Sequence, residues 1–229
     1  MNVHAKINST ADLLLQWYDE HRRELPWRAA PGMPSDPYEV WLSEIMLQQT
    51  MVVTVISYYR KFLTTWPNVY DLASASLDQV LVAWQGLGYY SRARNLHKCA
   101  QVVVTEHGGQ FPNTENGLRS LPGIGPYTAA AIAAIAFGRK ATPVDANIER
   151  IISRLYAISK PLPSSKIQIR SYAENLTPDQ RAGDFAQALM DLGSIICRPR
   201  LTKCGSCPLD HACRASLEEN PRRYPIKPT

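Results

Sequence analysis

Long apolar runs are absent from this sequence of 229 residues, and none approaches the roughly 20 residues that a membrane-spanning helix needs. The N-terminal residues lack a basic stretch followed by a long apolar segment, so no secretory signal is evident. Strand patterns are scarce, and we find no internal repeat and no low-complexity segment. These absences argue against a membrane protein, a repeat protein and a β-rich fold.

Cysteine is nearly absent outside one short segment. Four of the five cysteines lie within the last 33 residues, which points to a metal site in a reducing cytoplasm rather than to disulfide bonds. The 25 Lys and Arg residues outnumber the 20 Asp and Glu residues, and the resulting net charge of +5 suggests a polyanionic partner. Charge alone identifies no particular partner.

Helical patterns dominate what remains. With 45% hydrophobic and 20% charged residues, the chain can bury a substantial core in one large domain or two small ones. Apolar periodicity and Pro or Gly breaks predict helices at residues 11–22, 38–50 with a further helix running on to 62, 77–84, 92–107, 126–137, 148–158, 165–176 and 181–196. The sequence therefore predicts an all-α fold.

Residues 121–145, LPGIGPYTAAAIAAIAFGRKATPVD, hold the most distinctive pattern. Gly123 and Gly125 predict a tight turn, Pro126 suits the first position of a helix, and Gly138 suits its end. Such a turn directs unpaired backbone N–H groups outward at a helix start, where the helix dipole also favours an anion. Because no strand precedes it, the segment is neither a Rossmann nor a P-loop cradle. A simpler possibility is a turn between helices that needs glycine only for its shape.

The four clustered cysteines have the spacing C-x6-C-x2-C-x5-C, and they are Cys197, Cys204, Cys207 and Cys213. Four thiolates from one short segment could bind zinc in a tetrahedron or hold an iron–sulfur cluster. Zinc fits less well, because structural zinc sites usually pair two short-spaced couples and only one C-x-x-C is present. The fifth cysteine, Cys99, lies on a predicted helix, where we expect a buried small apolar side chain.

Three cations lie between the first two of these cysteines: Arg198, Arg200 and Lys203. Surface charges of this kind are often only solvated. A loop so rich in cations is nevertheless a good candidate for phosphate contacts, with binding that weakens steeply as salt rises.

Two of these patterns resemble one superfamily. The turn looks like the helix–hairpin–helix motif, which in that superfamily grips a DNA phosphate through the hairpin backbone, here at Gly123 and Gly125. The cysteine spacing matches the [4Fe–4S] loop of endonuclease-III-like DNA glycosylases. In those enzymes the aspartate after the hairpin is catalytic, which here is Asp145. Taken alone, Asp145 could equally be the N-cap of the following helix, and both roles can hold together.

Glu44 and its neighbours indicate the subfamily. Residues 41–50, WLSEIMLQQT, resemble the signature of adenine DNA glycosylases of the MutY type, which remove adenine mispaired with 8-oxoguanine or guanine. Further matches, which extend the resemblance over essentially the whole chain, are LPWR at 25–28, GLGYYSR at 86–92, RNLH at 94–97 and MDLG at 190–193. Outside this context Glu44 would be an ordinary glutamate on a helix surface.

A DNA glycosylase must protonate the departing base and stabilise a cationic sugar, tasks that glycosidases perform with two carboxyl groups. The resemblance implies that Glu44 protonates adenine N7 and later acts as a base toward water. It implies that Asp145 stabilises, or transiently bonds, the anomeric carbon. Tyr127 and Asn147 match polar residues that flank these two.

The resemblance also implies roles in DNA distortion and base binding. Gln49 and Tyr89 match side chains that wedge into the duplex as the adenine is flipped out. Trp27 and Arg28 match residues that line the adenine pocket. Without the resemblance, Trp27 and Tyr89 would be interpreted as core packing and Gln49 as a helix-surface amide.

Tyr127 predicts a monofunctional enzyme. In bifunctional relatives a lysine at this position attacks the sugar and leads to strand cleavage. A phenol cannot form that Schiff base, and Glu149 stands where some adenine glycosylases carry another lysine. We therefore expect an abasic site as the product.

Two departures from the family pattern stand out. Ala146 replaces the glycine of V-D-G-N, which fits a position that begins a helix. Members of the family usually continue into a NUDIX-like domain that inspects 8-oxoguanine, whereas this sequence stops at Thr229. We expect the catalytic domain alone, from a shortened or a short member, with weaker discrimination of 8-oxoguanine from guanine.

The resemblance predicts a two-lobed α-helical fold. Residues 31–142 would form a six-helix barrel lobe with the hairpin, and residues 1–30 with 143–229 a cluster lobe, with Asp145 at the seam. The partner would be double-stranded DNA with an A·8-oxoG or A·G mispair. A monomer in the bacterial cytoplasm, associated with the nucleoid, would bind it.

Two alternatives stay open. A relative of the same fold could remove thymine from G·T mismatches or an oxidised pyrimidine, since G·T thymine glycosylases also carry tyrosine at the hairpin. Glu44 and the LQQT run favour adenine. The other alternative is a non-catalytic DNA-binding module stapled by metal, against which Glu44 and Asp145 together argue.

Overall fold

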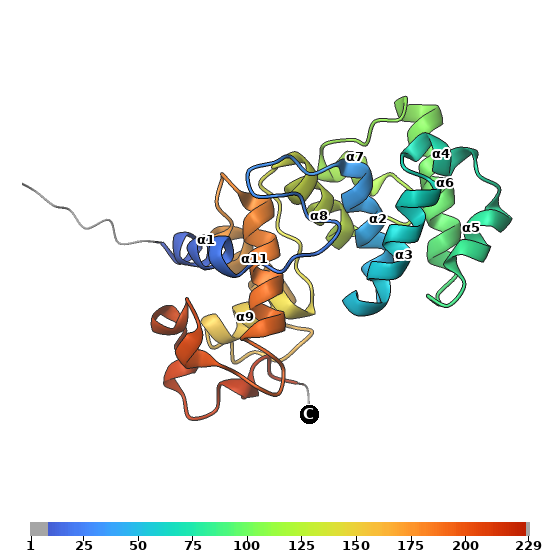
Figure 1. Cartoon of the computed structure of the whole chain (residues 1–229). Helices are drawn as coiled ribbons and strands as arrows, with labels where there is room; N and C mark the ends of the chain where they lie inside the picture. Colours follow the sequence, from blue (N-terminus) through green and yellow to red (C-terminus); the bar gives the residue numbers. More distant parts are fainter. Residues whose placement is uncertain (1–8, 228–229) are drawn as a thin grey trace, which may run out of the picture. The chain divides into compact units, whose positions relative to one another are not determined.

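The structure, a computed structural model, describes residues 9–227. Within them the chain forms eleven α-helices followed by four short 3₁₀ helices (Figure 1). The α-helices are α1 (Thr10–His21), α2 (Pro37–Leu47), α3 (Val52–Thr65), α4 (Val69–Ser74), α5 (Leu77–Trp84), α6 (Ser91–His107), α7 (Glu115–Arg119), α8 (Pro126–Phe137), α9 (Ala146–Leu155), α10 (Lys166–Leu176) and α11 (Ala182–Ile195). The only β pairing among the described residues is one isolated bridge between Cys197 and Thr202, so the all-α prediction is confirmed. In the same range no helix has both the length and the apolar character needed to cross a membrane.

Contacts divide the chain into two units, which we describe separately: Glu24–Pro143, and Met1–Arg23 with Val144–Thr229. The first unit holds α2 to α8 around one apolar core. α8 is buried from Thr128 to Ala134, because its alanines let α2 and α7 pack closely against it. α2 contributes Trp41 and Met46, each fully buried, and such burial stabilises by about 1.5–3 kcal/mol per side chain. The α2–α8 contact thereby fixes both the helix of Glu44 and the start of the hairpin helix.

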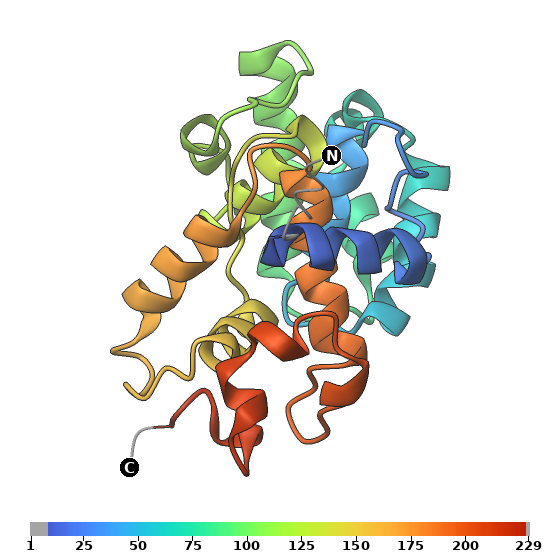
Figure 2. The ribbon, with the colours of Figure 1, turned by 90° about the vertical axis from the view of Figure 1, so that its left-hand side faces the viewer.

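The second unit joins the two ends of the sequence. α1 begins with a capping box between Ser9 and Asp12 and packs beside α11 (Figure 2). α9 packs against both α10 and α11 and buries an isoleucine-rich face against them. A guanidinium on the loop before α11, Arg181, pairs with Asp19 of α1 at 2.5 Å. These contacts hold α1 against α11.

Most predicted helices are found within one to three residues of their predicted ends. The limits of α5 and α8 match the predicted 77–84 and 126–137. α2 ends at Leu47 rather than at residue 50, because Gln49 takes a left-handed backbone with φ 57°. α4 was not predicted, since six residues are too few to show a helical period.

Candidate functional site

The predicted hairpin joins α7 to α8 in the unit Glu24–Pro143. Its two apolar residues, Leu121 and Ile124, are buried, whereas Gly123 and Gly125 face solvent. Gly123 has φ +77°, and a Cβ atom there would lie 2.7 Å from the Cβ of Asn95, so this position requires glycine. Gly125 is the N-cap of the 12-residue helix α8. The turn thus places two exposed glycines at a helix start, where backbone N–H groups have no partner within the helix, an arrangement that suits an anion.

Glu44 lies on α2 of the same unit and is only 6% exposed. Gln48, one turn later, donates a hydrogen bond to Thr128 Oγ1 of α8 at 3.3 Å. Tyr127, the neighbour of Thr128, is half-buried in the first turn of α8. Burial therefore distinguishes Glu44 from the surface glutamate that its sequence position alone allows.

Asp145 belongs to the other unit, where it is the N-cap of α9. Its Oδ1 accepts a hydrogen bond from the Ile148 N–H at 2.8 Å, and its Oδ2 accepts one from the Asn147 side-chain amide at 2.8 Å. Ala146 is the first helical residue, as predicted. Both oxygens of this half-buried carboxylate are therefore held in a fixed direction.

A chain of hydrogen bonds continues from Asp145 to the first of the clustered cysteines. Asn147 Oδ1 accepts from Arg150 at 2.8 Å, and Arg150 also donates to the carbonyl oxygens of Gly193 at 2.9 Å and Cys197 at 2.9 Å. Gly193 permits this close approach of α11 to α9, because a Cβ atom there would lie 2.8 Å from the Cβ of Asn147. The position of Asp145 is thus tied to the segment that carries Cys197.

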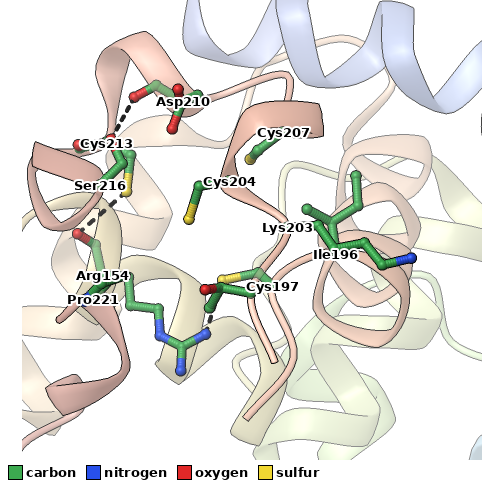
Figure 3. A pocket seen from close by; sticks show the side chains of 11 residues that line it. Arg154, Ile196, Cys197, Lys203, Cys204, Cys207, Asp210, Cys213, Ser216 and Pro221 are labelled. Atoms are coloured by element: carbon green, nitrogen blue, oxygen red, sulfur yellow. Dashed lines mark hydrogen bonds between the residues drawn. The ribbon is translucent and has the colours of Figure 1, made fainter. Parts of the chain in front are cut away.

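The four predicted metal ligands line one small cavity of about 30 Å³, and Figure 3 shows their sulfur atoms around a common space. They come from the end of α11 and from the loop with the 3₁₀ helices η1 (Cys204–Ser206) and η2 (Asp210–Ala212). Across residues 9–227, no three His, Cys, Asp or Glu side chains are grouped so that they could hold a single metal ion. The four cysteines therefore share the lining of one cavity.

Arg154 supports the cysteine segment from α9 and is only 2% exposed. It donates to Cys197 Sγ at 3.2 Å and to the Tyr224 carbonyl oxygen at 3.2 Å. Burial raises the pKa of the Cys207 thiol to about 12, and the neighbouring cysteines act in the same direction. Burial likewise raises the pKa of Cys213. Thiols in such surroundings lose their protons when they bind a metal cation, which takes the place of the protons.

Five predicted contact residues are exposed. Arg198, Arg200 and Lys203 face solvent beside the cysteines, and the Lys203 amine points away from the sulfur atoms (Figure 3). Gln49 and Tyr89 are exposed in the unit Glu24–Pro143. Exposure leaves all five side chains accessible to a partner.

The two predicted pocket residues are less accessible. Trp27 is 8% exposed, and its ring packs edge-on against Tyr59 with 5.4 Å between ring centroids. Arg28, its neighbour, is half-buried. Trp27 therefore has the core contacts that the sequence allowed for it, and any base contact must use the small exposed part of its ring.

Residues 42–178, more than half of the chain, match the sequence family described as HhH-GPD superfamily base excision DNA repair protein. The chain belongs to the HhH-GPD superfamily. It is 47% identical to the adenine DNA glycosylase of Homo sapiens, over 92% of this chain and 40% of that protein. It is 40% identical to the adenine DNA glycosylase of Buchnera aphidicola subsp. Acyrthosiphon pisum, over 95% of this chain and 62% of that protein.

A solved structure from the same comparison supports the HhH-GPD fold. A structure of a thermostable thymine-DNA glycosylase superposes with a TM-score of 0.80 and 33% identity, covering 90% of this chain and 94% of that chain. The predicted helix–hairpin–helix glycosylase fold is therefore confirmed. The chain spans about half the length of the curated adenine DNA glycosylases that it matches.

Three residues that organise the second unit of this HhH-GPD chain are not among those predicted from the sequence. Arg150 and Arg154 lie one turn apart on the buried side of α9, between isoleucines and Leu155. Cations are unusual on such a face, and this interruption was visible in the sequence. Gly193 gave no signal beyond its place in MDLG. It must be glycine only because α9 packs so close to it, and the sequence does not show that contact.

Proposed function

We propose that this HhH-GPD chain is the catalytic part of an adenine DNA glycosylase, which hydrolyses the N-glycosidic bond of adenine mispaired with 8-oxoguanine or guanine. The observation that carries the proposal is the burial of Glu44, 6% exposed, within the WLSEIMLQQT run of α2. Glutamates are seldom this buried, and a general acid that must meet a base inside a pocket has to be withdrawn from the surface. The curated relatives named above, both adenine DNA glycosylases, support the same assignment.

The two carboxyl groups divide the chemistry. Glu44 donates a proton to adenine N7, the bond between C1′ and adenine N9 breaks, and its electron pair leaves with the base. Asp145 stabilises the positive charge on the sugar, with its carboxylate aimed by Asn147 and the Ile148 N–H. Water then adds to C1′ and gives a proton to the Glu44 carboxylate. The products are free adenine and an abasic site.

The enzyme is monofunctional in this proposal. Tyr127 stands where bifunctional relatives carry lysine, and a phenol cannot form a Schiff base. At the second position used by some relatives, Glu149 Oε1 lies 3.6 Å from the amine of Lys166. A carboxylate at this position cannot form a Schiff base with the sugar.

Double-stranded DNA that carries the mispair is the proposed partner of a monomer in the bacterial cytoplasm. Phosphate contacts come from the hairpin backbone and from the exposed cations of the cysteine segment. Gln49 and Tyr89 enter the duplex as the adenine is flipped out. Trp27 and Arg28 line the pocket that receives it.

The four cysteines of Figure 3 are proposed to hold a [4Fe–4S] cluster. In a zinc site one ion lies about 2.3 Å from each sulfur, so the sulfur atoms crowd to within roughly 4 Å of one another. In a cluster each thiolate binds a different iron atom, and the sulfur atoms stay apart around a shared volume. The four cysteines line one cavity, and their C-x6-C-x2-C-x5-C spacing resembles that of the endonuclease-III-like cluster loop, so we favour the cluster. When bound, the cluster cross-links this segment and supplies one-electron redox chemistry.

Removal of thymine from G·T mismatches is a second candidate. The solved thymine-DNA glycosylase matches this chain over 94% of its own length, a larger share than for either adenine DNA glycosylase named above. Tyrosine at the hairpin suits both activities. Glu44 and the LQQT run favour adenine, so we rank this candidate second.

Single-turnover excision from matched duplexes tests the two candidates together. We expect adenine release from A·8-oxoG and A·G duplexes, and visible absorption by a bound cluster in the purified protein. Faster release of thymine from a G·T duplex would replace the proposal with the second candidate. Failure to release any base, including thymine glycol, would leave a DNA-binding module.

Glu44→Gln is expected to lower adenine release by at least about 100-fold, because the amide keeps the shape of the side chain but offers no acidic proton. Binding to the A·8-oxoG duplex, measured by fluorescence anisotropy, should stay largely intact. Glu106→Gln, an exposed glutamate on α6, is the matched control and should excise normally. Normal excision by Glu44→Gln would refute the role assigned to Glu44.

A further inference from the structure

Two exposed residues of the unit Glu24–Pro143 have left-handed backbones although neither is glycine. Gln49 has φ 57° in the turn between α2 and α3, and Tyr89 has φ 47° in the turn between α5 and α6. Tyr89 is 60% exposed. A left-handed conformation at a non-glycine residue costs free energy and persists only where the surroundings hold it in place. Both turns therefore need a support.

The support for the first turn is Arg92, a guanidinium from α6 with 8% exposure. It donates to the carbonyl oxygens of Ile45 at 3.2 Å, Met46 at 2.8 Å and Gln48 at 2.6 Å, and to Thr50 Oγ1 at 2.9 Å. These carbonyls end helix α2, so they lack partners within the helix. A cation at a helix C-terminus is also favoured by the helix dipole.

The same guanidinium holds the second turn. Arg92 donates to the carbonyl oxygens of Leu87 at 3.1 Å and Gly88 at 3.4 Å. Trp84 Nε1 donates to the Gly88 oxygen as well, at 3.0 Å. The guanidinium carbon lies 5.2 Å from the ring centroid of Trp84 and 5.6 Å from that of Tyr89. One planar group thus connects the turn of Tyr89 to the turn of Gln49.

We propose that Arg92 is a positioning residue that fixes the two turns to each other, so that Gln49 and Tyr89 stand ready to enter a duplex together. The role given to Gln49 and Tyr89 in entering the duplex rests on the proposed function. The coupling of the two turns by Arg92 does not depend on the proposed function. Lysine cannot replace Arg92, because a single ammonium has three donors and cannot reach six acceptors on two turns.

Hydrogen exchange measures the coupling without any catalytic assay. Arg92→Lys is expected to raise amide exchange in residues 48–50 and 86–89 together, by at least about tenfold, while α8 stays protected. Arg60→Lys, an exposed arginine on α3 of the same unit, is the matched control and should change neither turn. Unchanged exchange, or a rise in only one turn, would overturn the proposal.

A double-mutant cycle measures the consequence for excision. Arg92→Lys should slow adenine release from an A·8-oxoG duplex by about tenfold or more in the native background. It should have little further effect when Gln49 and Tyr89 are both alanine, because it acts through them. Fully additive losses would show a general structural role and would contradict the proposal.

The two arms separate the possible failures. Absence of adenine release from the unsubstituted protein would reject the proposed function, and the exchange measurement would still decide whether Arg92 couples the turns. If Arg92→Lys does not fold, Thr50→Val takes its place, since it removes one acceptor of Arg92 at nearly constant volume. Thr50 also donates to the Gln48 carbonyl oxygen at 3.3 Å, so the decisive measurement is exchange in the other turn. A rise at residues 86–89 is expected, and no rise there would overturn the proposal.

Discussion

Asp145 joins two duties in one carboxylate. Its oxygens accept hydrogen bonds from the Ile148 N–H and from the Asn147 side chain, and these bonds cap the start of α9. The proposed reaction needs the negative charge of the same carboxylate. Asparagine caps a helix about as well as aspartate, whereas alanine does not. Substitution can therefore separate the structural duty from the chemical one.

Asp145→Asn is expected to abolish adenine release while the stability of the protein stays nearly constant. Asp145→Ala should lose activity and also about 1 kcal/mol of unfolding free energy, because the N-cap is lost. Urea unfolding and single-turnover excision measure the two effects. Full activity of the asparagine variant would confine Asp145 to capping α9.

At the scale of single residues, the sequence was a good guide to residue types and a poor guide to their surroundings. It left Asp145 open between an N-cap and a catalyst, and the structure shows the cap without excluding chemistry. Arg150 and Arg154 were overlooked because most of their partners, such as the carbonyl oxygens of Cys197 and Arg198, lie more than 40 residues away in sequence. No local pattern encodes such long-range partners.

The hairpin shows how one element can use two glycines for different reasons. Gly123 is fixed by its φ of +77° and by the nearness of Asn95. Gly125 has φ −86°, and a Cβ atom added there would meet no atom within 4 Å. The fold therefore needs the first glycine, while the second leaves open space at the helix start.

Gly123→Ala should cost about 1–3 kcal/mol of unfolding free energy, since both backbone strain and overpacking oppose it. Gly125→Ala should cost less than about 1 kcal/mol. It should nevertheless weaken DNA binding about tenfold, because the added methyl group occupies the space that a phosphate would enter. Urea unfolding and fluorescence anisotropy test this contrast, and equal stability losses would speak against it.

Helices were predictable where the sequence shows an apolar period or a Pro or Gly that marks a helix end. Pro126 and Gly138 bound α8 in the sequence as in the structure. The end of α2 was not predicted, because the left-handed Gln49 is held by Arg92 on another helix. The 3₁₀ helices of the cysteine loop, three or four residues each, carry no period at all.

Over the whole molecule, an excess of five positive charges favours association with a polyanion. We expect the logarithm of the DNA association constant to fall linearly with the logarithm of salt concentration. Replacing Arg198, Arg200 and Lys203 together with glutamine should reduce that slope by about 3, one for each phosphate contact. Anisotropy titrations at several salt concentrations measure it. Arg60→Gln, which removes one charge instead of three, is the control and should leave the slope nearly unchanged. A fall of about 1 for Arg60→Gln, the same change per charge removed, would show that no local contact is involved.

The order of synthesis matters for a unit built from both ends of a chain. Asp19 on α1 meets Arg181 at a separation of 162 residues, so α1 leaves the ribosome long before its packing partner α11 exists. At elongation rates of about 5–20 residues per second this interval is roughly 10–30 s. Residues 24–143, by contrast, contain a complete core of their own and can fold while translation continues. The apolar side of α1, with Leu14 and Trp17, therefore has no α11 to pack against until residues 182–195 have been synthesised.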